Sequence, residues 1–394
     1  MNKLAIIITH PIQYYAPVFK LLSERKKIAI KVFYTYSQAK EKIWDKNFGK
    51  EIKWDIPLLE GYDYTFVGNI SIRPGIHHFF GLINPSLIKD IEEWHPSAIL
   101  VFGWNYYSHF KAMRYFKGRI PVYFRGDSTL LDEQPGIKKI IRKLFLTRIY
   151  KNIDYAFYVG SNNKQYYLAH GIKEQQLIFA PHAVDNNRFF DANGEFEKKA
   201  NEWRNMFGIN DDNLVVLYAG KFETKKNPDL IINAVIELNK NKETENRKSE
   251  IIQLIMVGNG ILETRLKEMA KDKKYIHFLP FQNQSIMPAI YRISDIFCLP
   301  STGPGETWGL AVNEAMACSR PVIVSDKVGC AIDLVKNKGT GFIFKNNDCN
   351  ELINILYFVE QNRQSLKEMG IKAHRHIKGF SLLDLVQSIE RELI

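Results

Sequence analysis

Residues 296–317 read IFCLPSTGPGETWGLAVNEAMA. The apolar run 296–299 is followed by a glycine-rich loop and then by a helical pattern over 311–318. A strand, a loop and a helix in this order are typical of one repeat of a parallel α/β sheet. The N–H groups at the start of such a helix can bind a phosphate group. No Gly-Lys-Ser/Thr sequence follows, so this is not a Walker loop.

The same alternation extends through both halves of the chain. The expected strands are 4–9, 28–34, 98–102, 121–124 and 155–159 in the first half, and 214–219, 251–257, 276–279, 296–299, 321–324 and 341–343 in the second. These two series predict an α/β protein of two Rossmann-like domains that face each other across a cleft, with ligands at the carboxyl ends of the strands. We assign residues 1–190 and 201–372 to the two domains. A helical segment, 373–394, is expected to return to the first domain.

Composition favours a globular protein. The 394 residues are 45% hydrophobic and 25% charged, which is ordinary for soluble domains. The apolar run 4–8 is interrupted by His10 and Pro11, so it is too short for a signal peptide, and no run approaches the ~20 apolar residues of a membrane span. We therefore expect a cytoplasmic location. The four cysteines form no CxxC pair, and no metal site is expected.

The positive charge is concentrated in the first half. Residues 1–200 hold 29 Lys and Arg against 19 Asp and Glu, whereas the remainder holds 25 against 24. This asymmetry indicates an anionic partner for the first half, either a membrane surface, a phosphorylated acceptor or nucleic acid. Residues 137–151 combine an apolar face with cations, which suits a helix lying on an anionic membrane or one packed on the sheet with a solvated basic face. No known nucleic-acid-binding module is present, so nucleic acid is the least expected partner.

Loops that follow strands in the second half suit a nucleotide diphosphate. Gly220 permits a tight turn, after which Lys221 and Lys226 can converge on an anion at the next helix start. A second loop, 258–260, contains two glycines. A solvated lysine-rich loop and a simple turn are the structural alternatives.

Two carboxylates lie in or after a third loop, the glycine-rich loop that follows the strand 296–299. Glu306 and Glu314 are eight positions apart, which would place their side chains about 80° apart on a single helix. We expect Glu306 in the loop, turned inward, and Glu314 on the helix, where an acidic side chain can bind the hydroxyls of a ribose. The alternatives are a charge partner for the helix N-terminus and a carboxylate on a solvated helix face.

Loops of the first half offer three further candidates. Asp127 is expected to bind the acceptor's hydroxyls or to receive its proton. Arg125 is expected to contact the donor phosphate or an anionic acceptor, and His10 to contact the reacting sugar. An Arg–Asp pair that shapes the loop and a structural histidine at a strand end remain the alternatives.

These motifs resemble those of the retaining glycosyltransferases of family 4, which have the GT-B fold. The segment 306–317 is similar to the family's Glu-x7-Glu motif, and 219–222 with Lys226 is similar to its Gly-Arg loop, with Lys221 in place of the arginine. The segments 181–185, 257–260, 281–282 and 295–301 follow in the family's order.

The resemblance implies that Glu314 binds the donor ribose, that Glu306 contacts the transferred sugar and that two lysines, Lys221 and Lys226, hold the diphosphate. Other donor-side positions are Gly220, Gly258, Asn259, Phe281, Gln282, Thr307, Trp308, Gly309 and Leu310. It also implies a UDP- or GDP-sugar donor, no cofactor, no metal and retention of anomeric configuration. The expected acceptor is a glycan, a glycolipid or a lipid-linked sugar of surface polysaccharide assembly. A nucleotide-sugar epimerase of related fold and a non-catalytic nucleotide-sugar-binding protein are the alternatives.

Overall fold

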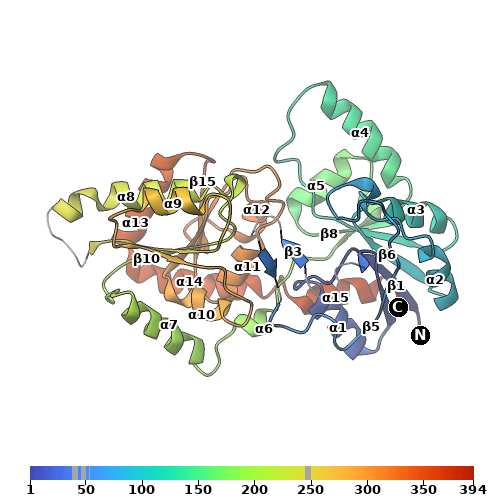
Figure 1. Cartoon of the computed structure of the whole chain (residues 1–394), viewed down its shortest axis with the longest axis horizontal. Coiled ribbons are helices and arrows are strands. Elements are labelled where there is room, and N and C mark those ends of the chain that lie inside the picture. The colour runs from blue at the N-terminus through green and yellow to red at the C-terminus, as the bar shows by residue number, and fades with distance from the viewer. Residues whose placement is uncertain (38–42, 46–49, 53, 245–249) are drawn as a thin grey trace. The chain divides into compact units, whose positions relative to one another are not determined.

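The structure is a computed structural model that describes residues 1–37, 43–45, 50–52, 54–244 and 250–394 (Figure 1). The chain forms two compact units. The first comprises residues 1–43, 52–183 and 381–394, and the second comprises 44–51 and 184–380. The unit boundary at 183/184 precedes the expected end of the first domain at 190. Of the expected C-terminal segment 373–394, residues 381–394 belong to the first unit and residues 373–380 to the second.

The first unit contains a parallel sheet in the order β5-β2-β1-β6-β7-β8-β9. Its strands are β1 (Lys3–Ile8), β2 (Ala29–Tyr34), β5 (Asp63–Phe66), β6 (Ala98–Phe102), β7 (Val122–Arg125), β8 (Tyr155–Tyr158) and β9 (Leu177–Phe179). The five strands expected from sequence are confirmed, and β5 and β9 were missed. Both are short edge strands without fully buried residues, so they lack the apolar run that marks an inner strand.

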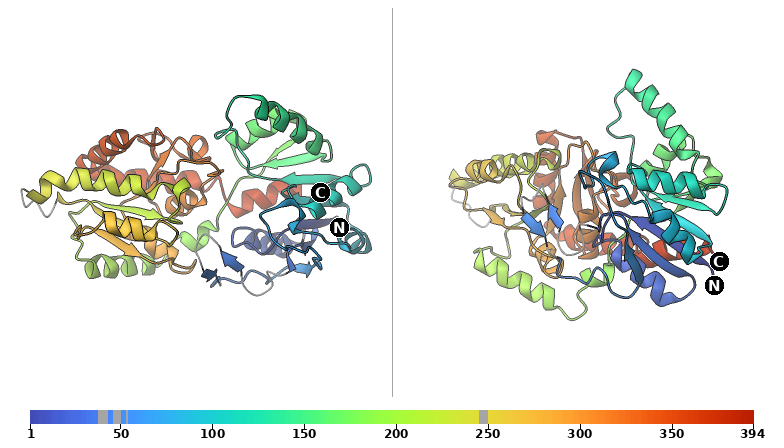
Figure 2. Two further views of the ribbon diagram at one scale, coloured as in Figure 1. Left: turned by 45° about the horizontal axis from the view of Figure 1, so that its top comes forward. Right: turned by 45° about the vertical axis from the view of Figure 1, so that its right-hand side comes forward.

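Helices cover both faces of this sheet (Figure 2). They are α1 (Ala16–Arg25), η2 (Phe79–Gly81), α2 (Leu87–Trp94), α3 (Tyr107–Phe116), α4 (Ile137–Tyr150), α5 (Ser161–Ala169), η3 (Glu174–Gln176) and α15 (Leu382–Arg391). Alternate residues of β1 point to opposite faces. Leu4 and Ile6 join a core that includes residues of α1 and α15, whereas Ala5 and Ile7 join a core with residues of α2, α3 and α5.

The second unit contains a parallel sheet in the order β12-β11-β10-β13-β14-β15. The strands are β10 (Val215–Ala219), β11 (Gln253–Val257), β12 (Ile276–Leu279), β13 (Ile296–Leu299), β14 (Val322–Ser325) and β15 (Gly341–Phe344). All six were expected. The helices are α6 (Asn186–Phe189), α7 (Glu195–Met206), η4 (Thr224–Lys226), α8 (Pro228–Thr244), α9 (Glu263–Met269), α10 (Met287–Ile293), α11 (Leu310–Ala317), α12 (Ala331–Leu334), α13 (Cys349–Gln361) and α14 (Arg363–Ile377). A separate two-stranded sheet pairs β3 (Ile43–Asp45) with β4 (Lys50–Ile52).

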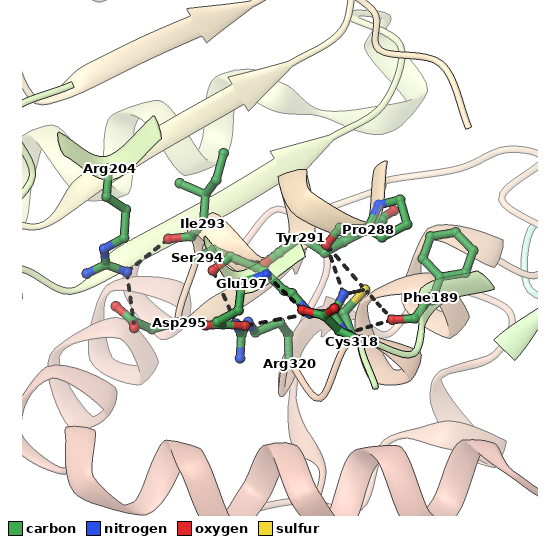
Figure 3. A network of polar contacts seen from close by, with 12 residues as sticks. Phe189, Glu197, Arg204, Pro288, Tyr291, Ile293, Ser294, Asp295, Cys318 and Arg320 are labelled. Carbon is green, nitrogen blue, oxygen red and sulfur yellow. Dashed lines mark hydrogen bonds and ion pairs between the residues drawn. The ribbon is translucent and has the colours of Figure 1, made fainter. Parts of the chain in front are cut away.

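Buried and partly buried polar contacts connect α7, α10 and the end of α11 (Figure 3). Arg204 of α7 donates to the carbonyl oxygen of Ile293 at 2.9 Å. Arg292 of α10 donates to the carbonyl oxygen of Phe189 at 2.7 Å and to Sγ of Cys318 at 3.1 Å. Because Cys318 caps α11, these contacts fix the helix that carries Glu314.

Candidate functional site

The loops after β10, β11 and β12 are hydrogen-bonded to one another at the carboxyl edge of the second sheet. Asn259 connects them, since its backbone oxygen accepts from the N–H of Phe222 and its side-chain oxygen accepts from the N–H of Phe281, at 3.0 and 2.9 Å. Gly258 lies so close to Gly220 that a Cβ at Gly258 would be 2.0 Å from the Gly220 carbonyl oxygen. The structure thus places these four expected donor-side positions, Gly220, Gly258, Asn259 and Phe281, together, and the close approach requires glycine.

Glu306 lies in the loop after β13, as expected, and is 8% exposed. The Ser301 hydroxyl donates to Oε2 of Glu306 at 2.8 Å, and the Lys226 ammonium contacts the same oxygen. Burial opposes ionisation, but the charge of Lys226 and the hydrogen bonds from Lys226 and Ser301 outweigh it and lower the pKa of Glu306. The carboxylate is therefore ionised at neutral pH. The sequence placed Lys226 near the anion site but did not indicate this ion pair.

Lys221 and Gln282 occupy the same edge. Lys221 is half-buried, and its carbonyl oxygen accepts from the Tyr218 hydroxyl at 2.8 Å. Gln282, also half-buried, donates from Nε2 to the Pro280 carbonyl oxygen at 3.1 Å. Since Lys221 follows β10 directly, its loop is held next to the end of that strand.

Glu314 lies on α11, as expected. The alternative, a carboxylate on a solvated helix face, is wrong because the side chain is buried. The residue is 3% exposed, and its Oε2 accepts from the Tyr291 hydroxyl at 2.7 Å. Tyr291 precedes Arg292, which is bonded to the end of the same helix. The hydrogen bond from Tyr291 of α10 thus orients the Glu314 side chain, and this contact could not be predicted from the sequence.

The start of α11 is shaped by Gly309. Its φ of +99° is a conformation that favours glycine, and a Cβ there would be 2.9 Å from Cγ1 of Val328. Trp308 is buried, and its Nε1 donates to Oδ1 of Asn313 at 2.8 Å. Thr307 and Leu310 on either side are half-buried. Because the indole is enclosed, the Trp308 side chain is not available to a ligand, whereas backbone N–H groups at the start of a helix can bind an anion.

In the first unit, Arg125 is almost fully buried at the end of β7. Its Nη1 and Nη2 donate to the carbonyl oxygens of Ala180 and Pro181, at 2.8 and 3.1 Å. A guanidinium held in this way stabilises the backbone after β9. This placement favours a structural role for Arg125 over the expected contact with a phosphate or an anionic acceptor.

Asp127 lies beside a histidine that we did not single out as a site residue. Its side chain is 47% exposed, and its Oδ2 lies 3.9 Å from Nε2 of His182. The Tyr15 ring stacks on His182, with centroids 6.0 Å apart. Burial lowers the pKa of His182, although the nearby carboxylate of Asp127 acts in the opposite direction. The position of His182 after β9 would have identified it, had that strand been predicted.

His10 lies at the end of β1. Its Nδ1 is 2.9 Å from Oγ1 of Thr9, and burial lowers its pKa to about 4. The imidazole is therefore neutral near pH 7, so it can exchange hydrogen bonds but cannot act as a cation.

The described residues offer neither a metal-binding cluster nor a membrane-spanning helix. They contain no group of three His, Cys, Asp or Glu side chains able to hold a metal ion. No helix in this part of the chain is long and apolar enough to cross a membrane.

The family model described as glycosyl transferases group 1 matches residues 199–376, which include all the donor-side residues above. The matched segment lies within the second unit. A curated relative, the D-inositol 3-phosphate glycosyltransferase of Gordonia bronchialis, is 28% identical over 186 residues, which are 45% of this chain. The match covers 39% of that relative, so less than half of its length is represented.

Solved structures match along the whole chain. Anabaena HepE in complex with UDP superposes with a TM-score of 0.73 at 15% identity, covering 100% of this chain and 99% of HepE. WaaG, a glycosyltransferase involved in lipopolysaccharide biosynthesis, has a TM-score of 0.67 at 12% identity, covering 99% of each chain. At these identities the likeness concerns the fold, which is that of two Rossmann-like domains of GT-B type.

Proposed function

We propose that this protein is a retaining glycosyltransferase that moves a sugar from a UDP- or GDP-sugar to a glycan, a glycolipid or a lipid-linked acceptor in surface polysaccharide assembly. The observation that carries the proposal is a pair of buried carboxylates in the segment that the glycosyl transferases group 1 model matches. Glu306 is paired with Lys226, and Glu314 is held by Tyr291. HepE was solved with UDP-glucose and WaaG takes part in lipopolysaccharide biosynthesis, which supports this donor and this pathway. We place the reaction in the cytoplasm.

In this proposal the donor nucleotide binds to the loops of the second unit. Glu314 accepts hydrogen bonds from the ribose hydroxyls, and Glu306 accepts from hydroxyls of the transferred sugar. The ammonium groups of Lys221 and Lys226 neutralise the diphosphate, together with the N–H groups at the start of α11. The base lies near Gly258 and Phe281.

The chemical step places negative charge on the departing phosphate oxygen. The bond from that oxygen to the anomeric carbon breaks, and the acceptor oxygen forms a bond on the same face of the sugar. Lysines and N–H groups already aimed at the diphosphate stabilise the charge as it develops, so neither a metal nor a cofactor is included. On the acceptor side, Asp127 receives the hydroxyl proton and His10 contacts the sugar.

The first experiment is a thermal-shift screen of the full chain with UDP-, GDP-, ADP- and CMP-sugars. We expect a UDP- or GDP-sugar to raise Tm, and expect Glu314→Gln to lose most of that shift. Stabilisation by none of the four would contradict the donor site.

Measuring conversion of the donor, with and without an acceptor, then distinguishes a glycosyltransferase from an epimerase and from a binding protein. Donor consumption that requires an acceptor, with a product of unchanged anomeric configuration by NMR, supports the proposal. Conversion of the donor alone would instead indicate an epimerase. Binding without conversion in the presence of lipid-linked and glycan acceptors would indicate a binding protein.

A further inference from the structure

Helix α4 exposes its apolar side chains to solvent. Five large apolar residues are between 52% and 75% exposed: Ile137, Ile140, Ile141, Leu144 and Phe145. Their spacing of three and four residues places them along one side of a helix. A helix of a globular protein normally buries such a side, whereas most of this one is uncovered by the described residues of the unit.

Only the last part of α4 is anchored. Its buried residues are Leu146, Ile149 and Tyr150, whereas residues 134–145 are all exposed. Phe145 makes an edge contact with Trp104, with ring centroids 5.6 Å apart. Figure 1 and the right-hand view of Figure 2 show α4 extending away from the rest of the first unit. The sequence left open whether this helix packs its apolar side on the sheet, and the exposure of its first turns excludes that for residues 137–145.

The charge of the helix identifies the partner. Residues 137–151 contain six cations and no acidic residue: Lys138, Lys139, Arg142, Lys143, Arg148 and Lys151. Glu133 lies 3.3 Å from Lys139, and residues 137–151 themselves hold no carboxylate to balance the other cations. Two copies of this helix would bring like charges together, whereas an anionic lipid surface supplies both opposite charge and an apolar layer.

We propose that residues 137–145 of α4 insert into the surface of an anionic lipid bilayer. The five exposed apolar side chains enter the boundary between headgroups and acyl chains, and the neighbouring lysines and arginines contact lipid phosphates. The inference goes beyond sugar transfer, because membrane binding can be measured without donor or acceptor.

Flotation of the full chain tests the proposal with vesicles of phosphatidylcholine alone or mixed with phosphatidylglycerol. We expect flotation with the mixed vesicles and little with the neutral ones. Ile140→Ser/Leu144→Ser should weaken binding by about tenfold or more, since it removes two of the inserted side chains. The matched control is Ile261→Ser/Ile332→Ser, which alters two equally exposed residues of the second unit and should float like the wild type.

A second measurement reports insertion directly. Phe145→Trp places an indole on the proposed buried side, and its emission should shift to the blue with the mixed vesicles. Circular dichroism should show that all variants retain the wild-type fold, because the altered side chains are exposed.

Three flotation results would overturn the proposal. These are absence of flotation with anionic vesicles, equal flotation with both vesicle types, and equal loss of binding in the control variant. A concentration-dependent dimer that Ile140→Ser/Leu144→Ser abolishes would also overturn it, by assigning the apolar side to a second copy of the chain.

Discussion

The ion pair between Lys226 and Glu306 allows a quantitative test of the donor site. We expect Lys226→Met to lower the free energy of unfolding by about 2–3 kcal/mol. Removal of one partner from a fully buried pair costs about 3–5 kcal/mol, and the lower value applies because the Lys226 side chain is 18% exposed. After the change Glu306, 8% exposed, retains the Ser301 hydroxyl as a donor.

A double-mutant cycle isolates the interaction. Glu306→Gln should cost only about 1 kcal/mol, because Lys226 can turn toward water. Lys226→Met/Glu306→Gln should then be less destabilised than the sum of the single variants, by about 1.5 kcal/mol or more. Urea unfolding followed by circular dichroism measures all four proteins.

The pH dependence has a definite sign. The pKa of Glu306 in the folded protein is lower than its ordinary value of 4.5. Its ionised form therefore stabilises the protein fully above about pH 4.5, and this contribution is lost as the pH falls through the lowered pKa. The stability difference between wild type and Glu306→Gln should shrink on acidification, and much less so in the Lys226→Met background. Additive effects in the cycle, or a Lys226→Met variant within about 0.5 kcal/mol of wild type, would refute the pairing.

Three further changes have defined outcomes. Tyr291→Phe removes a donor to the buried carboxylate of Glu314 and should lower the free energy of unfolding by about 1.5–3 kcal/mol; a loss below that range in urea unfolding would contradict the bond. Gly309→Ala should lower Tm measurably, because a Cβ is strained at this φ and meets Val328; an unchanged Tm would mean that the turn adapts freely. Arg125→Met should destabilise the protein by about 2 kcal/mol or more by leaving two carbonyl oxygens unpaired, while calorimetric UDP binding stays at the wild-type affinity. A loss of UDP affinity without destabilisation would restore Arg125 to the phosphate site.

Strands could be predicted from the sequence where burial in the sheet itself produces the apolar pattern. Inner parallel strands are apolar because helices cover both faces of the sheet, so their positions could be predicted. Edge strands such as β5 and β9 bury less and leave a weaker signal. The positions of Glu306 and Glu314 on loop and helix also followed from spacing.

Pairings between distant segments could not be predicted. The contact of Tyr291 with Glu314 spans 23 residues and depends on how α10 packs against α11. The hydrogen bonds of Arg125 to the carbonyl oxygens of Ala180 and Pro181 could not be predicted for a related reason. A charge at the end of a strand has the same sequence signature whether it faces a ligand or a buried carbonyl oxygen. His182 could be recognised as a neighbour of Asp127 only from the structure, because strand β9, which precedes it, was not predicted.

The first unit is assembled from both ends of the chain, which has a consequence for its biosynthesis. Helix α15 buries Leu385, Val386 and Ile389 in the core shared with β1, and Glu390 forms two hydrogen bonds with Arg25, at 2.8 and 2.9 Å. A ribosome therefore releases the whole second unit before it supplies the helix that covers one face of the first sheet. The second unit can fold during translation, whereas the first must wait with apolar surface uncovered. Expression of residues 1–183 alone should yield an aggregation-prone fragment, and adding 381–394 as a separate peptide should make it soluble.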